Sequence, residues 1–321
     1  MWASLKAELL EIGTACLTGT DASEYITQSS SGPGAGGMGS VFFSNGKQRV
    51  KLNLSETSPV LLTHQKLGKT TLTLDSKTYE GFLEKPGMHC PNQAFLTVSA
   101  SCIYSCSYCS VPKLRGKRKS IAEIKSLISQ AGTIKAVSLT SGVASSPEEE
   151  ETYILSVLDA LRPFFHQVGV EIYPLIGTAE KLYKAGVSEV KFNLETATDD
   201  LFEKHCPGLN RACIFDELKS AAALFGKGHV YTNVIYGLGE TDEEIRTLLA
   251  ELAEIGVIAS LRPLSPKSGV SGMNRPTKER MLRLFNIQSE IHTAYNLDTR
   301  CAQTMCGFCT GCDLVPGCDD E

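Results

Sequence analysis

The sequence lacks a long apolar run, an excess of positive charge and the marks of an export signal. Its 321 residues contain no stretch of about 18 consecutive apolar residues, so we expect no membrane-spanning helix. The formal net charge is −5, which provides no overall positive field to attract nucleic acid. The first 17 residues predict an amphipathic helix, and Glu8 and Glu11 within it do not suit a secretory signal or an acid-poor transit peptide. We therefore expect a cytoplasmic protein.

A glycine-rich stretch near the N-terminus lacks the residues of a phosphate-binding loop. The segment SSSGPGAGGMGS at 29–40 is not followed by the Gly-Lys-Ser/Thr of a phosphate-binding loop, so it predicts a linker or a turn. Short β-prone segments then occupy 41–84. Residues 1–93 are therefore predicted to form an N-terminal helix with a small β-rich appendage.

From residue 94 onward, apolar strand-like segments alternate with helical patterns. The predicted strands are 94–99, 135–140, 168–174, 189–194, 229–237 and 257–264, and the predicted helices are 120–131, 148–165, 178–186, 213–226, 241–255 and 276–293. This alternation predicts parallel strands joined by right-handed crossovers. Six units are too few for an eight-stranded barrel. We expect a mixed α/β fold, a partial (β/α)6 TIM-like barrel over 94–295, although periodicity does not exclude a doubly wound sheet.

The chain is rich in cysteine, with twelve in all. Clustered thiols in a chain without an export signal indicate metal binding more than disulfides. Eight of them fall in two groups: Cys102, Cys106 and Cys109, and then Cys301, Cys306, Cys309, Cys312 and Cys318. The isolated ones are expected to serve packing or to lie at the surface: Cys16, Cys90, Cys206 and Cys213.

The first cysteine group follows the predicted strand 94–99, at the end of a barrel strand where active sites collect. A structural zinc site needs four protein ligands, and here there are three thiols with no His or Asp nearby. Three thiolates on a cubane iron–sulfur cluster leave one iron open to another ligand. Zinc binding or a disulfide remains an alternative.

This stretch, Cys102-x3-Cys106-x2-Cys109 with Tyr108 before the last cysteine, resembles the signature of radical S-adenosylmethionine (SAM) enzymes. The resemblance implies a [4Fe–4S] cluster whose open iron binds SAM. It also implies an external one-electron reductant, a ferredoxin or a flavodoxin-like protein. Reduction then cleaves SAM to a 5′-deoxyadenosyl radical, which abstracts hydrogen from an unactivated C–H bond.

Further segments are similar to those of the biotin synthase and lipoyl synthase subgroup of that family, over about 94–295. They are LTSG at 139–142, FNLET at 192–196, VIYGLGET at 234–241 and RPLSPKSG at 262–269. The resemblance implies cofactor-binding roles for Tyr108, Ser141, Gly142, Asn193, Glu195, Gly237 and Arg262. Each of the strand-end residues could instead be structural, and Arg262 could pair with a core carboxylate.

The second cysteine group contains Cys306-x2-Cys309-x2-Cys312, which nearly matches a ferredoxin run whose remaining ligand lies elsewhere. We predict that residues 296–321 bind an auxiliary [4Fe–4S] cluster, with Cys301 or Cys318 as the fourth ligand. Zinc on four of these five cysteines is an alternative. A cluster bound by only three of these cysteines, with one iron open, is another alternative.

A basic segment follows the first group: Lys113, Arg115, Lys117, Arg118 and Lys119. It could attract an acidic carrier protein or a phosphorylated substrate, or be a solvated loop. With the auxiliary cluster, the resemblance implies sulfur insertion of lipoyl synthase type. The alternatives are radical methylation, rearrangement or cofactor biosynthesis with a cluster that only transfers electrons. A further alternative for the function is a non-catalytic iron–sulfur carrier. A further candidate partner is a second radical SAM subunit. No membrane or nucleic-acid partner is expected.

Overall fold

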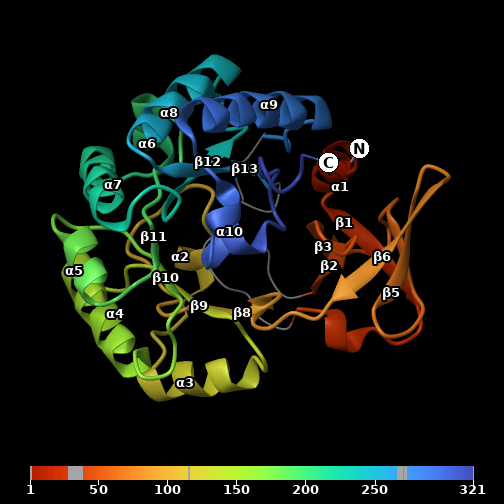
Figure 1. Cartoon of the computed structure of the whole chain (residues 1–321), viewed down its shortest axis with the longest axis horizontal. Helices are drawn as coiled ribbons and strands as arrows, with labels where there is room; N and C mark the ends of the chain where they lie inside the picture. Colours follow the sequence, from red (N-terminus) through yellow and green to blue (C-terminus); the bar gives the residue numbers. More distant parts are fainter. Residues whose placement is uncertain (1, 28–38, 115, 266–269, 271–272, 321) are drawn as a thin grey trace.

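The computed structural model describes residues 2–27, 39–114, 116–265, 270 and 273–320. Most of the glycine-rich stretch, predicted to be a linker or a turn, lies outside these residues. The described chain has two parts (Figure 1), a small closed β-barrel near the N-terminus and a curved seven-stranded sheet with helices around it.

The N-terminal part begins with helix α1 (Trp2–Ile12) and continues as a six-stranded barrel. Its strands, with one short 3-10 helix, are β1 (Thr14–Gly19), η1 (Ser23–Tyr25), β2 (Ser40–Ser44), β3 (Arg49–Leu54), β4 (Leu61–His64), β5 (Lys69–Leu74) and β6 (Lys77–Glu84). The prediction of one helix over the first 17 residues is wrong after residue 12. Gly13 adopts a φ of +70°, which an L-residue rarely adopts, and this ends the helix. The next six residues then pair in parallel with β3 and β4.

The second part contains six parallel strands in consecutive order, preceded by a two-residue antiparallel strand. The strands are β7 (His89–Cys90), β8 (Gln93–Thr97), β9 (Ala136–Thr140), β10 (Val168–Glu171), β11 (Glu189–Lys191), β12 (Val230–Tyr236) and β13 (Ile258–Pro263). The helices are α2 (Val111–Leu114), α3 (Ile121–Gln130), α4 (Pro147–Leu161), α5 (Thr178–Lys184), α6 (Asp199–His205), α7 (Arg211–Phe225), α8 (Asp242–Glu254) and α9 (Lys278–Tyr295). Ser120 and Thr241 form capping boxes before α3 and α8. The prediction of a mixed α/β fold with a partial-barrel sheet is confirmed.

The C-terminal segment enters the middle of the curved sheet. After η3 (Thr299–Cys301), the short helix α10 (Met305–Cys309) lies inside the ring of strands in Figure 1. The Ser138 hydroxyl accepts a 2.8 Å bond from the Met305 N–H, and the Gln93 amide donates a 2.8 Å bond to the Met305 carbonyl. A Cβ on Gly169 would stand 2.1 Å from Thr304 Oγ1, so only glycine admits this approach. Contacts with the strands therefore hold the segment in place.

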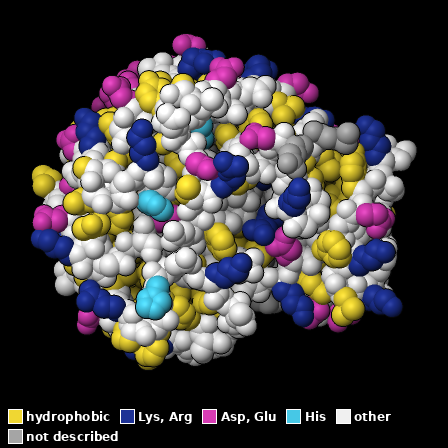
Figure 2. Space-filling model, in the orientation of Figure 1, with side chains coloured by type: hydrophobic (Ala, Val, Ile, Leu, Met, Phe, Trp, Pro, Cys, Tyr) yellow, Lys and Arg dark blue, Asp and Glu magenta, His cyan; other side chains and the backbone are white. Residues whose placement is uncertain are grey.

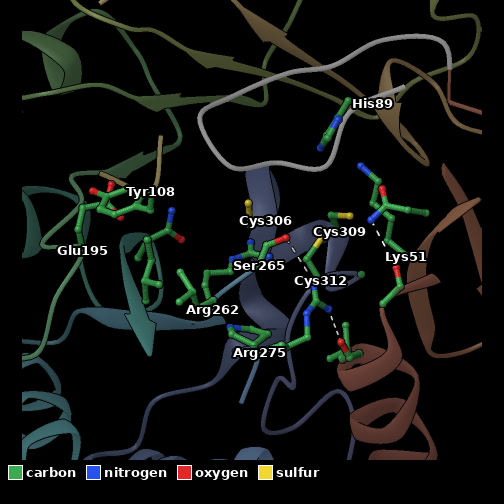
Figure 3. A pocket seen from close by; sticks show the side chains of 18 of the residues that line it. Lys51, His89, Tyr108, Glu195, Arg262, Ser265, Arg275, Cys306, Cys309 and Cys312 are labelled. Atoms are coloured by element: carbon green, nitrogen blue, oxygen red, sulfur yellow. Dashed lines mark hydrogen bonds between the residues drawn. The ribbon is translucent and has the colours of Figure 1, made fainter. Parts of the chain in front are cut away.

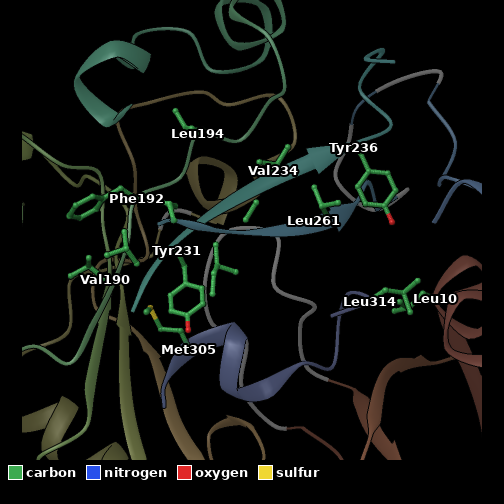
Figure 4. Packing of buried hydrophobic residues seen from close by; sticks show 14 of the residues in the cluster. Leu10, Val190, Phe192, Leu194, Tyr231, Val234, Tyr236, Leu261, Met305 and Leu314 are labelled. Atoms are coloured by element: carbon green, nitrogen blue, oxygen red, sulfur yellow. The ribbon is translucent and has the colours of Figure 1, made fainter. Parts of the chain in front are cut away.

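Apolar contacts continue this attachment (Figure 4). Met305 lies beside Tyr231 and Val190 of the sheet, and Leu314 lies beside Leu10 of α1. All five side chains are buried, so the C-terminal segment shares the core with both parts of the chain.

A buried ion pair ties the end of the chain to its beginning. Lys6 Nζ lies 2.7 Å from Asp319 Oδ2, and both side chains are almost wholly shielded from solvent. Trp2 Nε1 donates a 3.0 Å bond to the same carboxylate, and Lys6 donates a 2.6 Å bond to the Thr310 carbonyl. Removing one member of such a buried pair typically costs about 3–5 kcal/mol. The two termini consequently lie together, as Figure 1 shows.

A buried histidine in α9 makes the stability depend on pH. His292 is buried, and its Nδ1 has no hydrogen-bond partner among the described residues. Burial lowers the pKa of His292 to about 4 from its ordinary value of 6.5. As the pH falls below 6.5, His292 therefore becomes protonated in the unfolded chain but stays neutral in the folded chain. We expect the free energy of unfolding to drop by about 2 kcal/mol between pH 7.5 and pH 5 from this group alone.

Denaturant unfolding at both pH values measures this drop. In a His292→Gln variant, the free energy of unfolding should differ less between the two pH values, by the same amount. An identical difference in the variant and the parent protein would contradict the prediction.

The surface carries no large patch of one charge on the face shown in Figure 2, where Lys and Arg alternate with Asp and Glu. None of the described helices combines the length and the apolar character that crossing a membrane requires.

Candidate active site

The first cysteine group lies in the loop after β8, at the carboxyl end of the sheet. Cys109 is buried, and Cys102 and Cys106 are half-buried. The Val143 N–H donates a 3.5 Å bond to Cys102 Sγ, and the Ile103 N–H donates a 2.8 Å bond to the Val143 carbonyl. The loop that follows β9 thus holds the cysteine loop in place.

Ser141 and Gly142, predicted to contact the cofactor, form that neighbouring turn. A Cβ on Gly142 would stand 2.3 Å from the Ser101 carbonyl oxygen, so a larger residue would displace the cysteine loop. Ser141 Oγ accepts a 2.9 Å bond from the Ser99 N–H and donates a 2.6 Å bond to Glu150. Both residues support the loop, whatever further contact they make with a ligand.

Glu195 and Tyr108 lie side by side at one end of a pocket (Figure 3). Glu195 has a φ of +63° and exchanges backbone hydrogen bonds of 2.8 Å with Asn233 and Ile235 of β12. Burial, together with the nearby Cys106 and Glu171, raises the pKa of Glu195 to about 8. Such a left-handed non-glycine residue at a strand end is typical of functional sites.

Asn193 and Gly237 make hydrogen bonds to other residues of the chain. The Asn193 amide donates a 2.8 Å bond to Glu171 and accepts a 3.1 Å bond from the Asn233 N–H. Gly237 adopts a φ of +101°, and its N–H donates a 2.7 Å bond to Glu240. Their roles toward SAM remain predictions.

Arg262 lies away from Tyr108 and nearer the second cysteine group (Figure 3). Its Nε is 3.6 Å from Asp313 Oδ2, and both side chains are largely shielded from solvent. This is the pairing with a core carboxylate that the sequence left open. A contact between Arg262 and SAM stays a prediction.

A cavity of about 170 Å³ extends from Tyr108 of the first cysteine loop to the second cysteine group, and its described lining does not include Cys102, Cys106 or Cys109. Tyr108 and Glu195 lie at one end, and Cys306, Cys309 and Cys312 lie at the other (Figure 3). Its charged lining comes from several strands and from the chain after β13: Lys51, Glu171, Lys191, Glu195, Arg262 and Arg275. The small barrel supplies the lysine at position 51, so both parts of the chain form the cavity.

Two polar atoms of the cavity wall have no hydrogen-bond partner in the described structure, Lys191 Nζ and Asn233 Oδ1. Lys191 is nearly wholly shielded, and its ammonium is 3.8 Å from Glu171. A buried cation without a hydrogen bond is costly. A polar or anionic ligand in the cavity would relieve that cost.

The cysteines of the second group do not lie together. Cys306, Cys309 and Cys312 line the cavity, whereas Cys301 is exposed beside Gly228, outside the described lining. Cys318 also lies outside this lining, with its sulfur 3.9 Å from Thr299 Oγ1. Cys90, predicted from the sequence to be isolated, packs against Cys309 in the core.

The predicted basic segment is partly used inside the protein. Arg118 pairs with Glu150 at 2.8 Å and stacks on the Tyr153 ring. Lys119 Nζ donates a 2.6 Å bond to the Thr97 carbonyl. Arg115 lies outside the described residues. These contacts reduce the number of cations that a partner could meet.

Within the described part of the chain, no three His, Cys, Asp or Glu side chains converge closely enough to hold a single metal ion. Each thiolate of a cubane cluster binds a different iron, so its ligands stand farther apart than those of one ion. The three thiols after β8 come from one loop, and the Val143 N–H donates a hydrogen bond to one of them, Cys102. This donor set suits a cluster bound by three cysteines.

Residues 96–252 match the model of the Radical SAM superfamily. All three cysteines of the first group fall within this range, as do the strands from β9 to β12. The chain therefore carries a radical SAM superfamily domain. The family implies a [4Fe–4S] cluster and SAM as its cofactors.

Solved structures show the same fold at low identity. The FeFe-hydrogenase maturase HydG from Carboxydothermus hydrogenoformans is 19% identical with a TM-score of 0.52, over 63% of this chain and 52% of that chain. SuiB from Streptococcus suis, bound to its precursor peptide SuiA, is 18% identical with a TM-score of 0.53, over 65% and 48%. Methylornithine synthase is 17% identical with a TM-score of 0.50, over 61% and 62%. This chain thus spans only about half of the first two structures.

No curated protein matches the chain. The comparisons therefore support a radical SAM domain and do not select a subgroup. The predicted likeness to biotin synthase and lipoyl synthase stays a prediction.

Sequence reasoning did not find the contributions of Lys51, Cys90 and Lys191 to this region. Lys51 and Lys191 stand in ordinary strand patterns, Lys51 in the N-terminal part, and Cys90 stands in a two-residue strand that was not predicted. The only local signal was the Pro-Asn turn after Cys90, which returns the chain into β8.

Proposed function

We propose that this protein reductively cleaves SAM and uses the 5′-deoxyadenosyl radical to abstract hydrogen from a substrate in the cavity. The observation that carries the proposal is the cavity itself, which connects the cysteine loop of the radical SAM domain to a second set of thiols. When bound, the cluster at Cys102, Cys106 and Cys109 supplies one electron from an external ferredoxin or flavodoxin-like protein to the SAM sulfonium. The C–S bond to the adenosyl carbon breaks, and methionine leaves.

The residues of the chain would bind and orient the reactants. Burial favours the protonated form of Glu195, which can then donate a hydrogen bond to a ligand beside Tyr108. Lys191 and Asn233 offer a cation and an amide oxygen farther along the cavity. We infer a substrate with an anionic group that is small enough to lie between the two sets of thiols. The surrounding core keeps water from the radical.

Our leading proposal for the next step is sulfur insertion of the lipoyl or biotin synthase type. Cys306, Cys309 and Cys312 would hold a second cluster at their end of the cavity. That cluster would supply the sulfide for a new C–S bond and accept the electron left over when the substrate carbon loses its hydrogen atom to the 5′-deoxyadenosyl radical. Support comes from the thiols that face the cavity. An acidic carrier protein or a second radical SAM subunit remains a proposed partner.

The position of Cys306, Cys309 and Cys312 at the cavity also supports a second candidate function. A cluster there could accept one electron from the substrate radical and remain intact, as in a methylation, rearrangement or cofactor-forming reaction. A non-catalytic iron–sulfur carrier would not cleave SAM at all.

One experiment separates these proposals. The protein is reconstituted anaerobically with iron and sulfide, and iron is counted before and after one turnover with SAM, dithionite and an octanoyl-lysine peptide. About eight irons initially, deoxyadenosine formed and about four irons lost with sulfur on the peptide would support sulfur insertion. Deoxyadenosine with both clusters intact would favour the second candidate. No deoxyadenosine would contradict a radical SAM activity.

A further inference from the structure

Cys90 lies against the second cysteine group although about 200 residues separate them in the sequence. It forms part of β7, the short strand that turns back into the first parallel strand. Its side chain is fully buried and packs with Phe42, Phe95 and Cys309, with Cys306 against the same cluster.

The polar contacts around α10 make this approach specific. Gln93 follows Cys90 by three residues, and its amide joins Ser138 and the backbone of Met305 in one buried network. The distances are 2.8 Å to the Met305 carbonyl and 2.6 Å from the Ser138 hydroxyl. A network with every member bonded fixes the helix start in one position. It thereby sets Cys306 and Cys309 opposite Cys90.

The chain after α10 carries Cys312 around to the same cavity. The Gly311 carbonyl accepts a 2.7 Å bond from the Lys51 N–H. A Cβ on Gly311 would stand 2.7 Å from the Phe42 ring, so glycine is needed at this position.

Positive charge surrounds these four thiols. The Arg49 guanidinium donates a 3.2 Å bond to the Cys309 carbonyl. Lys51, Arg262 and Arg275 line the same end of the cavity as Cys312. A cluster held by four thiolates is negatively charged, and buried charge requires opposite charge close by.

The other two candidates have different surroundings. Cys301 is exposed, and Cys318 lies beside Thr299 with its carbonyl bonded to Gln48. Neither belongs to the described lining of the cavity. Cys90 does not line the cavity either, but unlike these two it packs against Cys309 and Cys306 in a buried cluster.

We propose that Cys90, Cys306, Cys309 and Cys312 together bind the second iron–sulfur cluster, and that Cys301 and Cys318 do not. This inference rests on the second cluster of the proposed function. Because four thiolates occupy all four irons of a cubane, the cluster has no open iron for a substrate. The substrate would therefore not bind to an iron of this cluster, whether the cluster accepts an electron or donates a sulfide.

The test uses the full chain with Cys102, Cys106 and Cys109 changed to Ala, so that only the second cluster can form. After anaerobic reconstitution, this parent should hold about four irons per chain. Adding Cys90→Ala should reduce the iron to less than one per chain. Adding Cys301→Ala or Cys318→Ala, the matched controls, should leave about four.

A folding defect is controlled by circular dichroism and by a Cys90→Ser variant. An oxygen ligand in place of sulfur should shift the electron paramagnetic resonance g-values of the reduced cluster. A cysteine that only packs beside the cluster would leave those values unchanged.

The outcomes are distinct. Four irons in a folded Cys90→Ala variant, or unchanged g-values in Cys90→Ser, would overturn the assignment of Cys90 while leaving a second cluster in place. No iron in the parent, or zinc in its place, would overturn both this ligand set and the second cluster of the proposed function.

Discussion

Replacing Cys102, Cys106 and Cys109 by Ala is expected to reduce 5′-deoxyadenosine formation to the level of a protein-free control. These three thiols share the loop after β8, whereas Cys206 and Cys213, the other cysteines in the match to the radical SAM family, lie at the end of α6 and in α7. Without that cluster, no electron reaches SAM. Chromatography of the products after incubation with SAM and dithionite measures the effect.

Cys16→Ala provides a matched control, because this cysteine belongs to β1 of the small barrel. It should form deoxyadenosine at the parental rate. If the triple variant also did so, the assignment of the cluster to this loop would be wrong.

Replacing Cys306, Cys309 and Cys312 by Ala is expected to remove about half of the iron, near four of eight atoms per chain. SAM cleavage without substrate should stay within about a factor of ten of the parent, a difference of about 1.4 kcal/mol in barrier. The reason is that these thiols lie at the far end of the cavity from Tyr108 and Glu195. Formation of the final product, in contrast, should be lost.

Iron analysis and deoxyadenosine assays on the same preparation provide both quantities. A variant that retains all its iron would contradict a cluster at this position. Loss of both iron and SAM cleavage, in a chain that circular dichroism shows to be folded, would indicate that the two groups of thiols serve one cluster.

Much of the larger part of the fold was predictable because its signals are local. The six strand segments, and the helices capped by Ser120 and Thr241, appear where the apolar pattern and the capping residues indicated. The four-residue helix α2 and the two-residue strand β7 were not predicted, since segments this short carry too little periodicity, and the seven-residue helix α6 was also missed.

The N-terminal part was harder to predict. Apolar residues continue from α1 into β1, and the positive φ of Gly13 alone separates helix from strand. The closure of the barrel depends on parallel pairing of β1 with β3 and β4, which no local pattern encodes.

The sequence by itself determined that three thiols share one loop, the donor set proposed for the first cluster, because their spacing is local. It also determined the alternation of strands and helices that puts this loop at the carboxyl end of the sheet. Only the tertiary structure decided which thiols meet at the second group. Cys90 and Cys309 are brought together by packing in the core, and Cys301 is directed to solvent although it is much nearer to Cys306 along the chain. Contacts between distant segments depend on how the whole chain packs, and spacing along the sequence carries no record of them.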